Sequence, residues 1–439
     1  MKTEQAKTSY TAAVFFDGTG NNRINSANDP NKFGRVTNIG RLFECCTVDD
    51  RVYIEGVGTR DNMDDSSIAK GTGENPPGYS GYSYMDKLEK GTNFIKAYQK
   101  LHEADEIELL VFGFSRGSTL ARDFSKKALA YPNVRIKFLG IFDTVVSLLL
   151  RSPNIHFTSS ELERVDCLLH LTAINETRGY FPLTSVQYHN GAKALVDIKN
   201  EYSDKVKEIF VPGAHSDVGG GYGGGIENIY LGKAVKEVAD LQADVATIKN
   251  TVSDQFSGST HYLIWTALLG DNVVFKEDSS TSGKARLGSS REDVPPAMSA
   301  VYFEVMGDYA NTTTNRSIFD FTSNITDGAL TQLKKDIAQY IKSNDPERGP
   351  NYDYAALAKF THISSNYGAI DSSNVKELTL NCFDPVLLKA EIKQVKAQNP
   401  SIDSRWLSEA AINEAFGFED LIDVNKPNNP QWHRGVIYG

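Results

Sequence analysis

The sequence predicts an α/β protein with a mostly parallel sheet covered by helices, followed by a largely helical carboxyl-terminal region. Short β-rich runs alternate with helical patterns through the first half of the 439 residues, which is typical of a parallel sheet with helices on both faces. Chemically active side chains follow those runs directly, at the edge where such sheets carry their sites. The length allows one large core with insertions.

Five apolar runs define the predicted strands, and each ends in turn residues. They begin at Tyr10, Arg51, Glu106, Val134 and Val206. Apolar residues at helical spacing lie between the second and third runs and again after the third, namely Met85, Leu88, Ile95, Tyr98, Leu120, Phe124 and Ala128. This alternation of strand and helix predicts a parallel core over residues 1–225.

The pattern changes after Gly225. Seven apolar residues spaced by threes and fours predict an amphipathic helix of about six turns: Leu231, Ala234, Val238, Leu241, Val245, Ile248 and Val252. Residues 253–300 are rich in Ser, Gly and charge, which predicts a surface loop or linker. We therefore expect a helical insertion and linker at 226–300, a candidate lid. Residues 301–439 should be mostly helical, with a candidate strand at 357–366 that returns to the core sheet.

Composition excludes some classes of function. Acidic residues outnumber basic ones by 56 to 46, and the net charge of −10 argues against nucleic acid as a partner. No apolar run approaches the roughly 18 residues of a membrane span, and the amino terminus lacks the apolar core of a signal peptide. The four cysteines lack the spacing of a zinc site, and the sequence predicts no cofactor and no metal.

A serine between two glycines is the first candidate catalytic feature. Gly113, Ser115 and Gly117 fit the pattern G-x-S-x-G, in which a sharp turn from strand to helix exposes the serine oxygen. An apolar strand precedes the motif and a helical pattern follows it, as the motif requires. Ser115 is therefore the candidate nucleophile.

A serine nucleophile needs a histidine base and a carboxylate that orients it. His215 is the preferred base because it ends a strand and enters a glycine-rich segment, and His362 is the rival. Asp143 closes the strand after the serine and is the preferred acid. Asp217 is the alternative, since the order Ser115, Asp217, His362 also fits an α/β-hydrolase.

The turn after the first strand, "FFDGTGNN", supplies candidates for stabilising the oxyanion. It lacks the third glycine of a dinucleotide-binding fingerprint. Backbone N–H groups of Gly18 or Thr19 could instead act together with that of Arg116, the residue after the serine. Asp17 would hold the loop, by pairing with Arg116.

Six ordered motifs carry a family resemblance. "FFDGTGNN", "GVGT", "GFSRGSTLAR", "FDTV", "AINETRGYFP" and "PGAHSDVGGGY", within about residues 10–225, resemble the α/β-hydrolase family of type VI secretion phospholipase effectors, the first class of these lipases. The resemblance implies an α/β-hydrolase core, a triad of Ser115, Asp143 and His215, and release of fatty acid from the first or second position of glycerophospholipids at a membrane surface. It also implies delivery, without a signal peptide, from the bacterial cytoplasm into a target cell's periplasm. The implied partners are a cognate immunity protein and a spike or tube component of the secretion machine.

Two other hypotheses fit the same residues. The chain could be a carboxylesterase acting on a soluble or cell-wall ester, because substrate does not follow from a core fold. It could also be a non-catalytic binding or scaffold module in which the glycine-rich loops only shape a surface.

Overall fold

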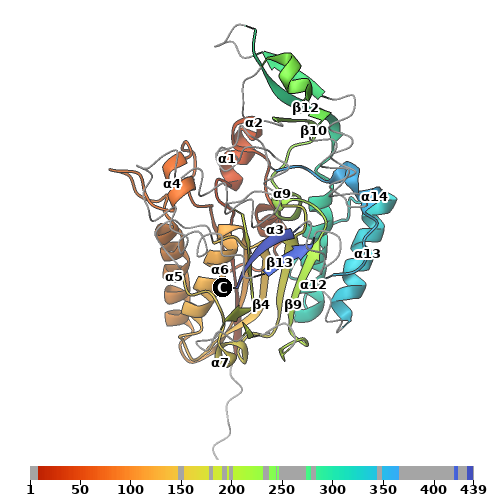
Figure 1. Ribbon diagram of the computed structural model, residues 1–439. Helices are drawn as coiled ribbons and strands as arrows, with labels where there is room; N and C mark the ends of the chain where they lie inside the picture. Colours follow the sequence, from red (N-terminus) through yellow and green to blue (C-terminus); the bar gives the residue numbers. More distant parts are fainter. Residues whose placement is uncertain are drawn as a thin grey trace, which may run out of the picture.

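A computed structural model describes residues 8–146, 153–176, 181–189, 195–196, 201–230, 237–243, 245–246, 273–277, 283–343, 349–364, 420–423 and 433–438. Its centre is a six-stranded, all-parallel sheet in the order β2-β1-β3-β4-β5-β9 (Figure 1). The strands are β1 (Ser9–Phe16), β2 (Arg51–Ile54), β3 (Glu106–Phe114), β4 (Val134–Phe142), β5 (Leu168–Ala173) and β9 (Val206–Val211). The predicted fold class is confirmed.

Strand β5 is the one central strand that the sequence analysis missed. Every residue of Leu168–Ala173 is buried, as expected for a central parallel strand covered on both faces. Its run is short, and His170 interrupts the apolar pattern. A buried histidine with polar partners therefore concealed the strand.

Helices cover both faces of the sheet (Figure 1). Helices α5 (Tyr84–Leu101) and α6 (Arg116–Ala128) pack on one face, and α3 (Asn38–Cys45), α12 (Met298–Thr314) and α13 (Gly328–Lys342) pack on the other. In β1, Ala13 and Phe15 face the α12 side, whereas Val14 and Phe16 face the α5 side. This alternation with a period of two gives the sheet two separate cores.

The strand order reverses at β1. The chain passes from β1 outward to β2 and then returns to β3 on the other side of β1. In doubly wound sheets, ligands bind beyond the carboxyl ends of the strands at such a point. Shorter elements surround this edge and the rest of the core: α1 (Arg23–Asn28), α2 (Pro30–Phe33), α4 (Ser67–Thr72), α7 (Ser159–Leu162), α9 (His215–Gly219), β7 (Tyr188–His189) and β8 (Leu195–Val196).

The insertion after the core contains an antiparallel sheet. Strands β10 (Gly225–Tyr230), β12 (Ala285–Val294) and β11 (Val273–Glu277) pair in that order and lie at the upper end of the molecule in Figure 1. The prediction of a loop or linker over 253–300 was therefore wrong for β11 and β12. Alternate side chains of β12 are buried, namely Ala285, Leu287, Ser289 and Arg291. Two of these four are polar, so composition concealed the period of two.

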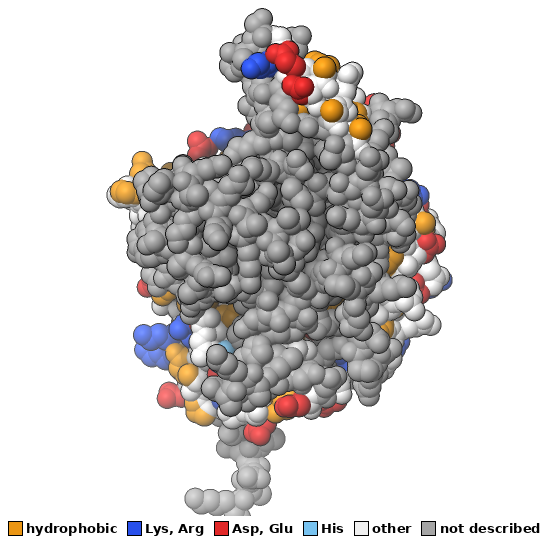
Figure 2. All heavy atoms as spheres, viewed as in Figure 1, with side chains coloured by type: hydrophobic (Ala, Val, Ile, Leu, Met, Phe, Trp, Pro, Cys, Tyr) orange, Lys and Arg blue, Asp and Glu red, His pale blue; other side chains and the backbone are white. Residues whose placement is uncertain are grey.

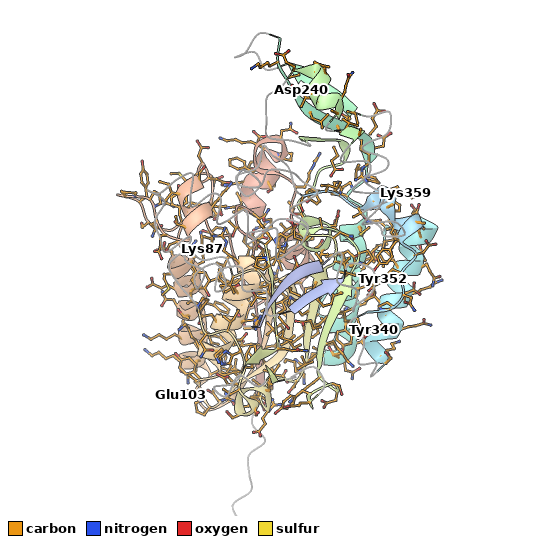
Figure 3. All side chains as sticks on the ribbon, viewed as in Figure 1. Lys87, Glu103, Asp240, Tyr340, Tyr352 and Lys359 are labelled. Atoms are coloured by element: carbon orange, nitrogen blue, oxygen red, sulfur yellow. The ribbon has the colours of Figure 1, made fainter. Side chains whose placement is uncertain are left out.

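Only part of the predicted six-turn helix falls on described residues. Residues 238–243 and 245–246 are helical, and Leu241 is buried, but Val238 is 40% exposed. The other stripe positions from Leu231 to Val252 lie outside the described residues, apart from Val245. Figure 3 shows Asp240 of this segment at the upper end, far from Glu103 at the opposite end. Figure 2 shows hydrophobic side chains beside acidic ones there, and Ile226 is 63% exposed.

The carboxyl-terminal region differs from its prediction at one strand. Leu357 ends α14 (Tyr354–Leu357), Ala358–Phe360 form a 3₁₀ helix, and residues 361–364 belong to no strand. The expected strand at 357–366 was wrong over 357–364, because Leu357 and Phe360 are buried at helical spacing, and residues 365–366 lie outside the described residues. Strands β13 (Asp420–Asp423) and β14 (His433–Tyr438) pair with each other, and β14 pairs in parallel with β6 (Leu183–Ser185).

Two tyrosines attach the carboxyl-terminal region to the end of β9. The hydroxyl of Tyr352 (Figure 3) donates to the carbonyl of Phe210 at 2.6 Å, and that of Tyr302 donates to the carbonyl of Pro212. Both contacts lie just before His215.

Among the described residues, no helix combines the length and the apolar character that a membrane crossing requires.

Candidate active site

Ser115 occupies a sharp turn between β3 and α6. Its φ of 58° and ψ of −127° lie in a region that residues with a side chain rarely adopt. A Cβ at Gly117 would lie 2.3 Å from the carbonyl oxygen of Phe16, and one at Gly113 would lie 2.5 Å from that of Gly117. The two glycines of the motif therefore allow the close backbone contacts that make the turn, as the nucleophile motif requires.

Asp143 follows β4 and is tied to the serine turn. The N–H of Val145 donates to the carbonyl of Ser115 at 3.5 Å, and the hydroxyl of Thr119 donates to the carbonyl of Val145 at 3.1 Å. Asp143 also has a positive φ, of 43°, and is fully buried. The backbone that follows Asp143 is thus fixed against the first turn of α6.

His215 meets Asp143 at the carboxyl end of the sheet. The Nδ1 atom of His215 lies 2.5 Å from Oδ2 of Asp143, while the N–H of Ala173 donates to Oδ1 of Asp143 at 2.8 Å. The rings of His215 and Phe114, the residue before Ser115, have centroids 4.6 Å apart. A carboxylate at Nδ1 keeps the proton there and leaves Nε2 basic, which is the tautomer that a triad needs.

The two alternative residues are paired with each other. Oδ1 of Asp217 lies 2.6 Å from Nδ1 of His362, and the backbone N–H groups of His362 and Ala214 both donate to Oδ2 of Asp217 at 2.9 Å. The ring of Tyr222 stacks on His362 with centroids 4.2 Å apart. Burial opposes the charging of His362, but Asp217 and then Glu227 raise the pKa of His362 above its usual value.

The loop after β1 is organised by Asp17. Its carboxylate accepts hydrogen bonds from the N–H of Gly18 at 2.7 Å and from the hydroxyls of Thr37 and Tyr53 at 2.7 and 2.6 Å. The expected pairing of Asp17 with Arg116 was wrong, since Nη2 of Arg116 donates to the carbonyl of Lys70. Burial raises the pKa of Asp17 to about 6, against the opposing effect of these three donors.

The same contacts reduce the set of oxyanion donors. The Gly18 N–H is already bound to Asp17, so it is not available as a donor. Within the described ranges, the backbone N–H groups of Thr19 and Arg116 have no hydrogen-bond partner. Thr19 and Arg116 are therefore the candidate donors that remain.

A comparison with protein-family models identifies the family of this chain. The family model of the type VI secretion (T6SS) Tle1-like phospholipase effector catalytic domain matches residues 11–126 and 121–239, which together make up more than half of the 439-residue chain. This chain belongs to that family. Ser115, Asp143 and His215 lie inside the matched range of the Tle1-like domain, and His362 lies outside it.

A solved structure agrees with the family at the level of the fold. The structure of the Tle1 effector bound to the VgrG spike of the type 6 secretion system is similar to this Tle1-like chain, with 19% identity, a TM-score of 0.51, and 82% of this chain and 85% of that one covered. An uncharacterized protein from Pseudomonas aeruginosa matches with 17% identity over 97% of this chain and 65% of that one, at a TM-score of 0.37. No curated protein matches the sequence.

A buried network beside Asp143 in the Tle1-like domain was missed from the sequence. Nδ1 of His170 lies 2.9 Å from Oε2 of Glu208, and Nε2 of His170 accepts the N–H of Thr144, the residue after Asp143, at 3.1 Å. Burial lowers the pKa of His170. Burial alone would raise the pKa of Glu208, but His170 and two further donors lower it to about 2. Because no strand was predicted at His170, this network was not predicted either.

Glu176, in "AINETRGYFP", also contacts the site. Its Oε2 accepts the backbone N–H of His215 at 3.2 Å, and its carboxylate accepts the hydroxyl of Ser364 at 2.8 Å. The motif could have pointed to it, because a charged residue there follows a buried strand. Among the described residues, no group of three His, Cys, Asp or Glu side chains could hold a metal ion.

Proposed function

We propose that this chain is a serine phospholipase of the A type, with Ser115 as nucleophile, His215 as general base and Asp143 as the acid that orients the histidine. Membership of the Tle1-like family supports phospholipase activity. The observation that carries the assignment of residues is the 2.5 Å contact between His215 and Asp143, beside the strained turn that holds Ser115.

The chemistry follows from these positions. His215 takes the proton of the Ser115 hydroxyl as its oxygen attacks the ester carbonyl, and then gives that proton to the departing alcohol, a lysophospholipid. Water, deprotonated by His215, cleaves the acyl-enzyme and releases the fatty acid. Asp143 keeps Nδ1 protonated and stabilises the imidazolium that forms.

The backbone N–H groups of Thr19 and Arg116 would bind the oxyanion of each tetrahedral intermediate. Thr19 lies in the loop after β1, and Arg116 is the first residue of α6, which follows β3. Strands β1 and β3 are neighbours in the sheet. Arg116 also starts a 13-residue helix, whose amino terminus favours a developing negative charge.

Delivery is part of the same proposal. Because the related Tle1 effector is bound to a VgrG spike, we expect this chain to be carried by a spike component of a type VI system. Its substrate would be membrane glycerophospholipid in the periplasm of a target bacterium, and the producing cell would need a cognate immunity protein.

The test measures lysophospholipid and free fatty acid separately after purified protein is added to defined phospholipid vesicles. Wild type should release both products in equal amounts, and Ser115→Ala should release about 10³-fold less or lower still. Equal activity of the two proteins would refute the nucleophile. A fluorophosphonate should label wild type and not Ser115→Ala, whereas a non-catalytic module would not be labelled at all.

A second measurement separates a phospholipase from a carboxylesterase on soluble esters. The rate on short-chain phospholipid should rise sharply when the lipid concentration passes the threshold for micelles. A preference for monomeric short esters, with no rise on micelles or vesicles, would contradict the phospholipase assignment.

A further inference from the structure

Helix α6 carries two buried arginines whose guanidinium groups are held differently. Arg122 is fully buried, and burial lowers its pKa to about 10. Its Nε, Nη1 and Nη2 each donate to a backbone carbonyl at 3.0–3.1 Å, those of Ile155, Thr184 and Ser185. All three nitrogens of Arg122 are therefore used to hold the fold.

Arg116 has a side-chain donor without a hydrogen-bond partner in the described part of the chain. The residue is 9% exposed, and its Nη2 donates to the carbonyl of Lys70. Its Nη1 is buried and has no hydrogen-bond partner among the described residues. No carboxylate among those residues forms an ion pair with this guanidinium. Burial lowers the pKa of Arg116 to about 10, which still leaves the group charged at neutral pH. A buried cation with an unpaired donor is costly unless an anion joins it.

The unpaired nitrogen belongs to the residue next to the proposed nucleophile. Arg116 follows Ser115 directly, and its side chain contacts Lys70. Lys70 in turn approaches the oxyanion loop, the turn after β1 that carries Gly18, Thr19 and Gly20. The Cε atom of Lys70 lies 3.0 Å from the position of a Cβ at Gly20, next to Thr19. The hydroxyl of Thr19 is likewise buried and without a partner in the described part of the chain.

The neighbouring cation is already neutralised. The ammonium group of Lys70 lies 2.6 Å from the carboxylate of Asp65. Of these two cations, Arg116 is thus the one with both an uncompensated charge and a spare N–H. A guanidinium presents its donors in a fixed planar fork that matches phosphate oxygens.

We propose that the guanidinium of Arg116, through Nη1, binds the phosphate of the lipid headgroup while Ser115 attacks a neighbouring acyl ester. The inference rests on the proposed function and adds the group that selects phospholipid over neutral lipid. Arg116 would then act twice, with its backbone N–H on the oxyanion and with its side chain on the substrate's phosphate.

The test uses two substrates that differ by one methyl group. Phosphatidylmethanol is an anionic phosphodiester, and the dimethyl ester of phosphatidic acid is the corresponding neutral triester. Both are prepared with the same acyl chains and presented in the same uncharged detergent micelles. Wild type should hydrolyse the diester with a kcat/KM about tenfold higher or more, as expected for a charge-assisted hydrogen bond. A wild-type ratio near one would overturn the proposal without any variant.

Three variants locate the selectivity. Arg116→Gln should lower kcat/KM on the diester about tenfold or more and leave the triester within about threefold. Arg116→Lys should restore part of the ratio, because it keeps a charge without the fork. Lys127→Gln, which removes a half-exposed cation near the other end of α6, is the matched control and should keep the wild-type ratio. Equal loss on both substrates in Arg116→Gln would give Arg116 a structural role only and overturn the inference.

Two further outcomes are distinguishable. If millimolar inorganic phosphate protects wild type against thermal unfolding but the diester-to-triester ratio is near one, the site takes free phosphate and the headgroup assignment is overturned. If wild type hydrolyses neither ester, the proposed function fails with it. If Ser115 is required and the ratio alone is near one, only the inference about Arg116 fails.

Discussion

Nδ1 of His362 lies 2.6 Å from Oδ1 of Asp217, so the site contains a second histidine–carboxylate pair beside that of His215 and Asp143. The second pair joins α9, the short helix after β9, to the segment 361–364 of the carboxyl-terminal region. His362 lies outside the matched family domain, and Asp217 also accepts two backbone N–H groups. We therefore interpret the second pair as a structural tie between the two regions.

Substitution of each histidine separates the two roles. His215→Ala should reduce kcat by about 10³-fold or more, close to the loss in Ser115→Ala, because both remove a member of one catalytic unit. His362→Ala should retain activity within about tenfold but lose about 1–3 kcal/mol of stability, since it leaves the buried Asp217 without its partner. Vesicle hydrolysis and urea unfolding measure the two effects. The opposite ranking of activities would make His362 the base.

Much of this site could be predicted from the sequence because it consists of strand ends. Ser115, Asp143 and His215 each follow a β-rich run, and parallel strands bring such positions to one edge. The partners of Asp17 could not be predicted, because Thr37 and Tyr53 come from segments whose approach depends on tertiary packing. The strand β12 was missed for a related reason: its buried positions include Ser289 and Arg291, whose burial depends on partners far along the chain.

The absence of a side chain at Gly56 leaves room for the backbone of the oxyanion loop. A Cβ there would lie 1.7 Å from the carbonyl oxygen of Gly18, so Gly56→Ala must displace the loop that carries Thr19. We expect kcat to fall about 10²–10³-fold, as for the loss of an oxyanion donor, and KM to change less. Gly71→Ala is the matched control, because nothing lies within 4 Å of a Cβ at Gly71. Near-normal kcat in Gly56→Ala would exclude this loop from oxyanion binding.

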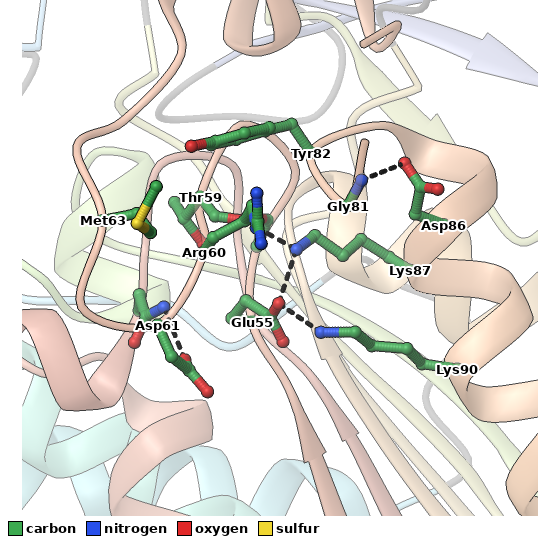
Figure 4. A network of polar contacts seen from close by, with 12 residues as sticks. Glu55, Thr59, Arg60, Asp61, Met63, Gly81, Tyr82, Asp86, Lys87 and Lys90 are labelled. Carbon is green, nitrogen blue, oxygen red and sulfur yellow. Dashed lines mark hydrogen bonds and ion pairs between the residues drawn. The ribbon is translucent and has the colours of Figure 1, made fainter. Parts of the chain in front are cut away.

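Two lysines share one carboxylate next to the site (Figure 4). The ammonium groups of Lys87 and Lys90 both contact Oε1 of Glu55, and Lys87 also donates to the carbonyl of Thr59 at 2.7 Å. Lys87 is fully buried, whereas the Lys90 side chain is 48% exposed. Burial lowers the pKa of Lys87 to about 8.

The lysines should therefore differ in their contribution to stability. Lys87→Met should cost about 3–5 kcal/mol, because it removes the buried partner of Glu55, leaves that carboxylate with the partly exposed Lys90 alone, and leaves the buried carbonyl of Thr59 without its donor. Lys90→Met should cost at most about 1 kcal/mol, because its pair is partly solvated. Urea unfolding of both variants at pH 7 measures the difference. Equal costs would mean that burial does not control this network.

The pKa of Asp17, raised by burial to about 6, predicts how stability depends on pH. An unfolded aspartate has a pKa near 3.9, so between about pH 4 and 6 the folded state binds more protons at Asp17 than the unfolded state does. The stabilisation from this group is complete below about pH 4 and is lost as the pH rises through about 6. Two pKa units correspond to about 3 kcal/mol.

Asp17→Asn removes that titration, so the difference between wild type and variant isolates its contribution to stability. The free energy of unfolding of wild type minus that of the variant should fall by up to about 3 kcal/mol between pH 4 and 7, with most of the change between pH 4 and 6. Tyr53→Phe removes one donor to the carboxylate and should move the upper end of this window to higher pH, because the hydroxyl of Tyr53 favours the ionised form. Urea unfolding at half-unit pH intervals tests both variants. A difference that stays flat or rises with pH would mean that the Asp17 carboxyl is not held in an environment that favours its protonated form.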